Sequence, residues 1–410
     1  MTNDRLKQLI KQTSETWARN YGSRGNCVEA FVESVGGPDD TAKLLEDHPI
    51  EAICHNFKGV ERFMESEYGS LMEDNGGVSA SATAIFSLLG VSAAVYNAYE
   101  TPKDFVADKA CYQEPSKTFQ EPKAWLYQPD LPDQLDDMEE PSESGFYPRS
   151  LVVTNSDFGK AWKVSRRAID DDQVGQLARI PSQIGELHKN LEEIYFAAYL
   201  YSTNLTLNGK AVPVPTYQDP DGTAGFYKTT GTRANAITPA ALSLNAIQDL
   251  ITLSKAIQDP GGKTLLVRPS LLIGGTGVSF TAATILNSTY YPAPISTATG
   301  PTATGTFMSV NPLDTKYGAL RAALEYAEEP YFNGTADLAA SASSKLWWGM
   351  QEPKKNGIIK QNRQALEVLM EAANSGGSIR TRSIYHRTYQ RYAYYHGDAR
   401  FCFRGSDGSV

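Results

Sequence analysis

The chain has 410 residues, enough to bury one or more hydrophobic cores, and its 41% hydrophobic and 21% charged residues exclude a disordered protein. A net charge of −9 argues against strong non-specific binding of the whole chain to nucleic acid. The four cysteines are far apart and form no CxxC pair, which argues against a zinc site or a disulfide framework and favours a reducing cytosol.

The first hundred residues predict helices separated by glycine pairs at Gly36-Gly37 and Gly76-Gly77. The N-terminus lacks the apolar core of a signal peptide. The most apolar stretch, residues 80–98, is broken by Gly90, so we expect a buried helix there and no membrane span.

Residues 101–165 are rich in proline, and residues 121–147 carry eight acids and one base, Lys123. Such a polar run cannot build its own core. Strand-like segments at 124–128 and 149–164 flank it, which predicts a long hairpin that rests on a neighbour. An ordinary surface loop is the alternative reading.

A helix is predicted over residues 182–201, because apolar residues recur there at spacings of three and four. This seam consists of Ile184, Leu187, Leu191, Ile194, Ala198 and Tyr201, and Glu192 and Glu193 are expected on the other faces. A second helix is expected to begin at the N-cap Thr238 and to end before Asp259.

The remaining elements are predicted as strands at 264–267 and 270–273, a helical or mixed segment at 278–286, and a loop over 287–316. An aromatic strand follows at 346–350. Residues 345–404 carry eleven bases and four acids, so the back of the chain is basic where the hairpin is acidic.

No catalytic constellation stands out. None of the five histidines has metal-ligand spacing, and no GxSxG motif is present. The three acids Asp170, Asp171 and Asp172 could bind a cation, but acids just before a helix are better explained by its positive end and by the adjacent Arg166 and Arg167. We therefore predict a protein that is not an enzyme and has no cofactor or metal.

Several phrases resemble one family. The sequence VSRRAIDDDQ at residues 164–173 resembles the phrase before the long helix of Mu-like major head proteins of tailed phages, and LLVRPSLL at 265–272 resembles a later phrase. Trp347, followed by Gln351-Glu352-Pro353 and an Arg/Tyr-rich closing segment, matches as well. The resemblance covers roughly residues 100 to 405.

This resemblance implies the Hong Kong 97 capsid fold, an α+β architecture. It assigns residues 1–120 to an N-terminal helical region and N-arm, and 121–165 to the extended loop (E-loop). It assigns 166–204 to the P domain with its spine helix, 205–340 to the A domain, and 341–410 to C-terminal P-domain strands. We expect no Lys–Asn cross-link and no removal of an N-terminal segment.

The implied function is a major capsid protein that assembles with itself, as hexamers and pentamers, into the head shell around a double-stranded DNA genome. The implied partners are a portal protein, possible decoration proteins and packaged DNA without sequence reading. The protein would be part of the virion and assembled in the host cytoplasm. An encapsulin-like compartment, a carboxylate-dependent hydrolase and a tail or adhesin protein remain as alternatives.

Charge pairing predicts the contacts between subunits, with acids of the hairpin facing arginines of adjacent subunits. The acids are Asp130, Asp133, Asp136, Asp137, Glu139 and Glu140, and the arginines are Arg380, Arg382, Arg387 and Arg391. Arg166 and Arg167 are two further candidates for contacts between subunits.

Overall fold

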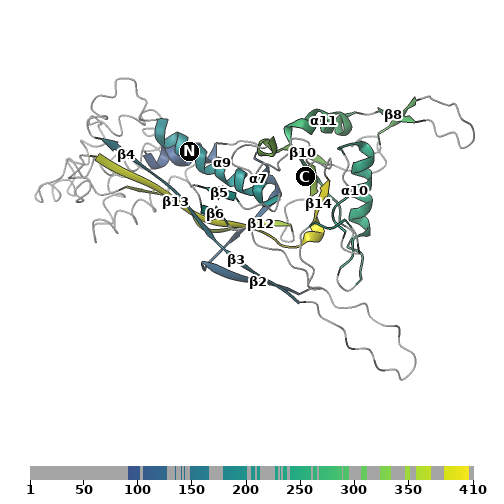
Figure 1. Ribbon diagram of the computed structural model, residues 1–410, viewed down its shortest axis with the longest axis horizontal. Coiled ribbons are helices and arrows are strands. Elements are labelled where there is room, and N and C mark those ends of the chain that lie inside the picture. The colour runs from purple at the N-terminus through teal and green to yellow at the C-terminus, as the bar shows by residue number, and fades with distance from the viewer. Residues whose placement is uncertain are drawn as a thin grey trace, which may run out of the picture. The chain divides into compact units, whose positions relative to one another are not determined.

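The computed structural model combines helices and strands (Figure 1), which confirms the predicted α+β class. It describes residues 91–101, 105–126, 134, 140, 143, 148–165, 179–200, 205–207, 210–212, 227–229, 231, 234–237, 241–259, 262–265, 267–288, 290–294, 306–311, 324–333, 347–350, 357–370 and 383–405. The helices expected before residue 91 and most of the acidic hairpin tip lie outside the described residues.

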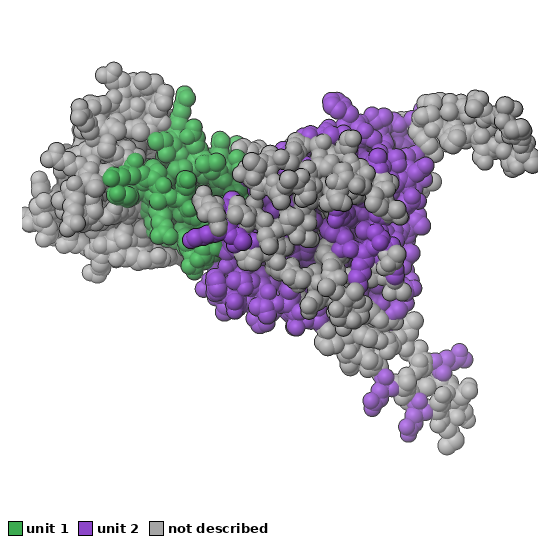
Figure 2. Space-filling model, in the orientation of Figure 1, with its two compact units in different colours: residues 1–103, 157–191, 364–391 green, residues 104–156, 192–363, 392–410 purple. Residues whose placement is uncertain are grey.

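The chain forms two compact units, coloured in Figure 2. Unit 1 comprises residues 1–103, 157–191 and 364–391, and unit 2 comprises residues 104–156, 192–363 and 392–410. Helix α9 (Arg179–Leu200) and strands β12 (Ile358–Met370) and β13 (Ser383–His396) contribute residues to both units. The units cut across the five segments expected from sequence, which stay a prediction.

Unit 2 contains a four-stranded sheet in the order β10-β7-β11-β14. Its strands are β10 (Glu325–Glu328), β7 (Leu271–Gly274), β11 (Trp347–Met350) and β14 (Cys402–Gly405). The predicted strands at 270–273 and 346–350 are therefore confirmed within one residue. Trp347 is fully buried and pairs with Gly405, where a Cβ atom would overlap the indole ring.

Helix α10 (Leu244–Ala256) packs into the same core through Ala246, Ile247 and Leu250. Its N-cap is Ser243, whose hydroxyl accepts from the Ala246 amide at 3.2 Å, so the predicted start at Thr238 is wrong. The backbone of Ser243 is extended, as is usual for an N-cap residue. Ser243 lies closer in sequence to the apolar residues of the helix than Thr238 does.

The other short elements correct two expectations. Of residues 264–267 the structure describes all but residue 266, and those described lie in no strand, although Thr264 forms an isolated bridge with Gln258. Helix α11 (Ser279–Asn287) follows the short 3-10 helix η1 (Thr276–Val278), as the mixed segment predicted. The expected loop after it contains a hairpin of β8 (Tyr290–Pro294) and β9 (Thr306–Val310). Another short hairpin joins β5 (Leu205–Leu207) and β6 (Lys210–Val212).

A second four-stranded sheet has the order β1-β12-β13-β4, with β4 spanning Ser156–Ser165. Its strand β1 (Cys111–Pro115) runs parallel to β12, from Cys111 beside Ile358 to Pro115 beside Asn362. This strand and the short helix α7 (Val106–Ala110) lie in the segment expected to be helical, so that expectation is wrong for residues 111–115.

Helix α9 confirms the predicted helix, but the predicted seam is partly wrong. Ile184 and Ala198 are buried, whereas Leu187 is 57% exposed. Glu192 and Glu193, expected on an outer face, are buried. From Tyr195 to Leu200 every residue is buried, so this half of the helix is covered on all sides.

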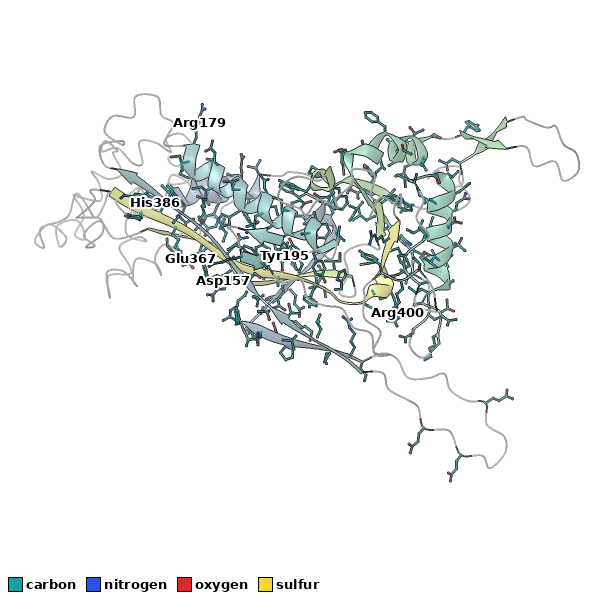
Figure 3. All side chains as sticks on the ribbon, in the orientation of Figure 1. Asp157, Arg179, Tyr195, Glu367, His386 and Arg400 are labelled. Carbon is teal, nitrogen blue, oxygen red and sulfur yellow. The ribbon has the colours of Figure 1, made fainter. Side chains whose placement is uncertain are left out.

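In unit 2 the buried half of α9 contacts aromatic residues of β13. Tyr195, Tyr392 and Tyr394 form a tyrosine cluster, with the Tyr195 ring 5.8 Å from Tyr392 and 5.2 Å from Tyr394. Figure 3 labels Tyr195 among the side chains of this region. Three tyrosines of the Arg/Tyr-rich segment, Tyr392, Tyr394 and Tyr395, are thus buried in the core.

In unit 1 the other half of α9 contacts helical residues 91–100 closely. A Cβ atom at Gly185 would overlap the carbonyl oxygen of Val95, so glycine is required there. Tyr96 donates to the carbonyl of Leu366 at 2.5 Å. His386, labelled in Figure 3, stacks on Trp162 at 5.1 Å.

Candidate functional site

The projecting hairpin is the first candidate site, and it consists of β2 (Gln120–Leu126) and β3 (Pro148–Thr154). The strands pair in register from Gln120 beside Thr154 to Leu126 beside Pro148. Side chains of a strand alternate between two faces, so the hairpin has an inner and an outer face. The predicted hairpin is therefore confirmed at its base, although its second strand ends at Thr154 and β4 joins a different sheet.

The outer face of the hairpin carries no charged residue among those the structure describes. Leu126 is 64% exposed and Val152 is 58% exposed. We call this set the hairpin outer face, and it comprises Gln120, Pro122, Ala124, Leu126, Ser150 and Val152. Large apolar side chains at this exposure favour a surface that another protein covers.

The inner face is fastened to the rest of unit 2. Arg149 is buried, and its guanidinium donates to the carbonyl oxygens of Gly397 and His396. Asn155 is also buried, donates to the carbonyl of Thr118 at 3.0 Å and accepts from Gln361 at 3.0 Å. These bonds fix the direction in which the hairpin leaves the body.

Lys123, the one base among residues 121–147, forms its contacts within the chain. Its ammonium lies 3.1 Å from Glu114 and 3.5 Å from Glu121. It also lies 5.9 Å from the centre of the Tyr395 ring, and the Tyr395 hydroxyl donates to Glu114 at 2.5 Å. Burial, together with the Glu114 carboxylate, raises the pKa of Tyr395. Lys123 thus serves the base of the hairpin.

The structure describes three of the twelve residues predicted to make charged contacts. Glu140 is exposed in the hairpin tip. On β13, Arg387 is exposed, whereas Arg391 forms an ion pair with Asp157 at 2.6 Å. The other nine lie outside the described residues, namely Asp130, Asp133, Asp136, Asp137, Glu139, Arg166, Arg167, Arg380 and Arg382. The charge pairing stays a prediction.

Sequence reasoning missed the apolar outer face. The alternation of Leu151, Val152 and Val153 in β3 is too weak to show which side faces water, because Leu151 and Val153 are apolar as well. The inward direction of Arg149, between two faces of similar hydrophobicity, depends on carbonyl groups nearly 250 residues away.

A second set of groups, buried in unit 2, tests the enzyme alternative. Glu193 accepts from the backbone amides of Val106 at 2.7 Å and Ala107 at 3.1 Å. Burial raises the pKa of Glu193, and burial plus the neighbouring Glu193 carboxylate raises the pKa of Glu329 well above its usual range. The two carboxyls share a hydrogen bond, so one holds a proton. Both side chains are buried, so neither carboxyl group is exposed to solvent among the described residues.

The neighbouring carboxylate, Glu192, forms a buried ion pair with Lys360 at 2.7 Å. The Lys360 ammonium lies 5.0 Å from the centre of the Tyr392 ring, and Tyr394 donates to the carbonyl of Glu192 at 3.2 Å. The ion pair with Lys360 compensates the buried charge of Glu192, which was expected on an outer face of the helix.

The part of the chain that the structure describes holds no cluster of three or more metal-ligating side chains. Cys111 and Cys402 are buried free thiols, and burial raises the pKa of both. Among the described helices, none is long and apolar enough to span a membrane.

Comparisons with known proteins agree on one class. A family model described as "Phage capsid protein" matches residues 150–404, more than half of the chain. A search of curated proteins found no match.

Solved structures with a similar chain trace are named after phages, a phage capsid and a GTA particle. The chain named "Mycobacterium phage Adephagia" is 13% identical with a TM-score of 0.40, and the match covers 76% of this chain and 89% of that one. The chain named "Asymmetric unit of bacteriophage PhiM1 mature capsid" is 12% identical with a TM-score of 0.44, and the match covers 72% of this chain and 84% of that one. The chain named "Capsid of empty GTA particle computed with C5 symmetry" is 11% identical with a TM-score of 0.42, and the match covers 74% of this chain and 90% of that one. These likenesses are distant, and the family match carries the assignment.

Proposed function

The chain belongs to the phage capsid protein family, and from that membership we propose how it builds a phage head: the β2–β3 hairpin lies on a neighbouring copy and holds it through the hairpin outer face. The protein is a structural shell protein. The observation that carries the proposed contact is the exposure of Leu126 and Val152 on a hairpin whose inner face is fixed to its own unit.

The energetic basis of the contact is burial of apolar surface. Covering a leucine or valine side chain completely contributes about 1.5–3 kcal/mol, and these two are more than half exposed in the single chain. One such contact is weak on its own. In a closed shell each copy gives and receives the contact, so many weak contacts act together.

The acidic residues of the hairpin tip would help to align the hairpin correctly on the adjacent copy. Glu140 and its acidic neighbours would face arginines of the adjacent copy, where exposed pairs contribute about 0–1 kcal/mol each. Among the described arginines, Arg387 is the stronger partner because Arg391 already pairs with Asp157. Arg380 and Arg382 complete the proposed set, and Arg166 and Arg167 stay candidates for other contacts between subunits.

The finer assignments follow the Hong Kong 97 scheme. In that scheme residues 121–165 act as the E-loop, α9 acts as the spine helix, residues 205–340 form the A domain, and 341–410 return to the P domain. We propose hexamers and pentamers assembled in the host cytoplasm, joined by a portal protein and possible decoration proteins. Packaged double-stranded DNA would contact the shell without sequence reading.

Neither main alternative is favoured by an observation. An encapsulin-like shell would enclose cargo enzymes, and particles that contain DNA would distinguish the two. A carboxylate-dependent hydrolase would need an accessible acid pair, and the pair Glu193–Glu329 is buried.

The proposal is tested by expressing the full chain and examining it by negative-stain microscopy and sedimentation. We expect closed shells. A variant with Asp133, Asp136 and Asp137 changed to Asn should assemble more slowly at low salt and at the wild-type rate at high salt, because screening removes steering in both proteins. A compact single subunit at high concentration would contradict the shell-forming function, and unchanged low-salt kinetics would contradict the role of the acidic tip.

A further inference from the structure

Three segments of unit 2 meet at two buried glutamates, Glu193 and Glu329, which we call the carboxyl pair. Glu193 lies on α9 and accepts from the backbone amides at the start of α7, with Val106 at 2.7 Å (Figure 1). Glu329 follows the edge strand β10, and its side chain accepts at 3.1 Å from the amide of Tyr331 in the 3-10 helix η2 (Pro330–Asn333). The pair thus connects segments that are far apart in the sequence.

The hydrogen bond between the two carboxyl groups requires a proton, because an ionised carboxylate can only accept. The bonding pattern places this proton on Glu329. Glu193 accepts from two backbone amides, which favours its charged form. The Oε2 atom of Glu329 is buried and has no amide or hydroxyl donor among the described residues. A charged oxygen in that position would be unfavourable, whereas a protonated one can donate to Glu193.

The lysines on the neighbouring segments do not replace this proton, because other carboxylates bind them. Lys360 of β12 forms the buried ion pair with Glu192 at 2.7 Å, and Lys109 of α7 pairs with Glu325 of β10 at 3.0 Å. The Lys109–Glu325 pair is largely exposed, so it contributes little to holding α7 near β10. The proton on the carboxyl pair is therefore the buried link between these segments.

The other titratable groups around the carboxyl pair favour its protonated state. Asp108 of α7 adds a like charge, which raises the pKa of Glu193. Cys111 of β1 and Tyr394 of β13 also face Glu193, and burial raises the pKa of both well above their usual range, so they stay neutral near pH 8. Strand β7 and η2 carry no charged residue. These surroundings thus supply no positive charge that would stabilise two ionised carboxylates.

We infer that one proton shared by Glu193 and Glu329 holds α7 and the β10–η2 segment against α9, and that its loss at alkaline pH lets these segments separate. Loss of the proton leaves two buried negative charges in contact, which repel each other. Strand β10 is held in its sheet by four residues paired with β7, so few other backbone bonds oppose the separation. The inference concerns a single subunit and goes beyond the proposed shell-forming function.

The pH range of the test follows from the direction of the shift. Burial raises the pKa of both carboxyl groups above the ordinary 4.5, and the Glu193 carboxylate raises that of Glu329 further. The stability that the proton contributes is therefore fully present below pH 4.5 and is lost as the pH rises through the raised pKa of the folded pair. Histidines change stability below about pH 6.5 and thiols near pH 9, so pH 7 to 8.5 is the range in which the pair can be followed.

Denaturant titration of the full chain at pH 7 and pH 8 tests the inference. The unfolding equilibrium constant of the wild type should rise by about tenfold over this pH unit, because the unfolded chain releases a proton that the folded chain keeps. Glu329→Gln donates an amide hydrogen to Glu193 without titrating, so its constant should stay nearly level. The control Glu328→Gln removes a charge at the exposed neighbouring residue and should follow the wild type. The same pH dependence in wild type and Glu329→Gln would show that the inference is wrong.

Two further measurements locate the effect and do not depend on shell formation. At pH 8.5, backbone amides of residues 105–110 and 325–333 should exchange hydrogen faster in the wild type than in Glu329→Gln, whereas amides of α10 should exchange alike. Equal exchange in both proteins would contradict the separation of these segments. Infrared spectroscopy of the wild type at pH 7 should show the carbonyl stretch of a protonated buried carboxyl group, even if Glu329→Gln does not fold. Absence of this band would mean that Glu329 is ionised and would overturn the inference, whether or not the chain forms shells.

Discussion

The tyrosine cluster and the hairpin outer face lie in the same unit, yet they differ in how much of their apolar surface the chain itself covers. Tyr195, Tyr392 and Tyr394 are almost completely buried and contact one another. Leu126 and Val152 are mostly exposed, although the strands that carry them are fully paired. The cluster is complete in one chain, whereas the hairpin outer face is completed by a neighbour in the proposed shell.

This difference has a measurable form. A change in the interior should lower the free energy of unfolding of the chain, and assembly should suffer only as a result. A change on the hairpin outer face should leave unfolding almost untouched and act on assembly directly. The four predictions below run from the largest expected change in the free energy of unfolding to the smallest.

The largest effect is expected at the tyrosine cluster. Tyr195→Ala removes a fully buried ring and should lower the free energy of unfolding by about 3–5 kcal/mol. Tyr195→Phe keeps the ring and loses the hydroxyl, so we expect about 1 kcal/mol. Denaturant titration of the full chain measures both. Equal losses for the two variants would mean that the hydroxyl, and not the packing of the ring, stabilises the cluster.

The second-largest loss in the free energy of unfolding is expected when the pH is lowered. Burial lowers the pKa of His386 from 6.5 to about 4 and also lowers the pKa of His396. The unfolded chain therefore binds more protons than the folded chain between these values, so stability is present above pH 6.5 and is lost as the pH falls toward 4. For His386 alone the loss across the window is about 3 kcal/mol.

The variant His386→Phe separates the contribution of His386 to the pH dependence of stability from the contributions of other groups. It keeps an aromatic ring against Trp162 and has no proton to bind, whereas His396 titrates in both proteins. Stability measured from pH 7 to pH 4 should therefore fall less steeply in the variant. Parallel pH profiles would show that His386 is protonated in the folded chain and would contradict its buried, neutral state.

The close approach at Gly185 should give a smaller loss. Gly185→Ala places a methyl group against the carbonyl of Val95, and we expect about 1–3 kcal/mol from overpacking. Alanine favours helices more than glycine does, so propensity alone would raise stability by up to about 1 kcal/mol. Thermal unfolding decides the sign, and a stabilised variant would show that the two helical segments can move apart.

The sequence predicted the helices and strands of the interior better than it predicted which residues contact them. Periodicity found α9 because a helix repeats over its own length. It placed Glu192 and Glu193 on the surface, because their partners Lys360, Val106 and Ala107 are far away in the chain. Local capping rules favoured Thr238 as the N-cap of α10, whereas the helix begins after Ser243.

The surfaces were harder to predict for the same reason. The acidic tip is visible in composition, but the outward direction of Leu126 and Val152 follows from the position of Arg149 beneath the hairpin.

The smallest effect on unfolding is expected on the hairpin outer face, and there assembly should change most. The double variant Leu126→Ser with Val152→Ser alters exposed side chains, so the free energy of unfolding should change by no more than about 0.5 kcal/mol for each. Shells should nevertheless become scarce, because both side chains lose the apolar area that a neighbour would cover. Leu187→Ser is the matched comparison, since Leu187 is 57% exposed but lies on α9. Sedimentation of the three proteins measures the yield: loss of shells in the double variant alone places the contact on the hairpin, whereas normal shells in the double variant would show that the neighbour leaves this face uncovered.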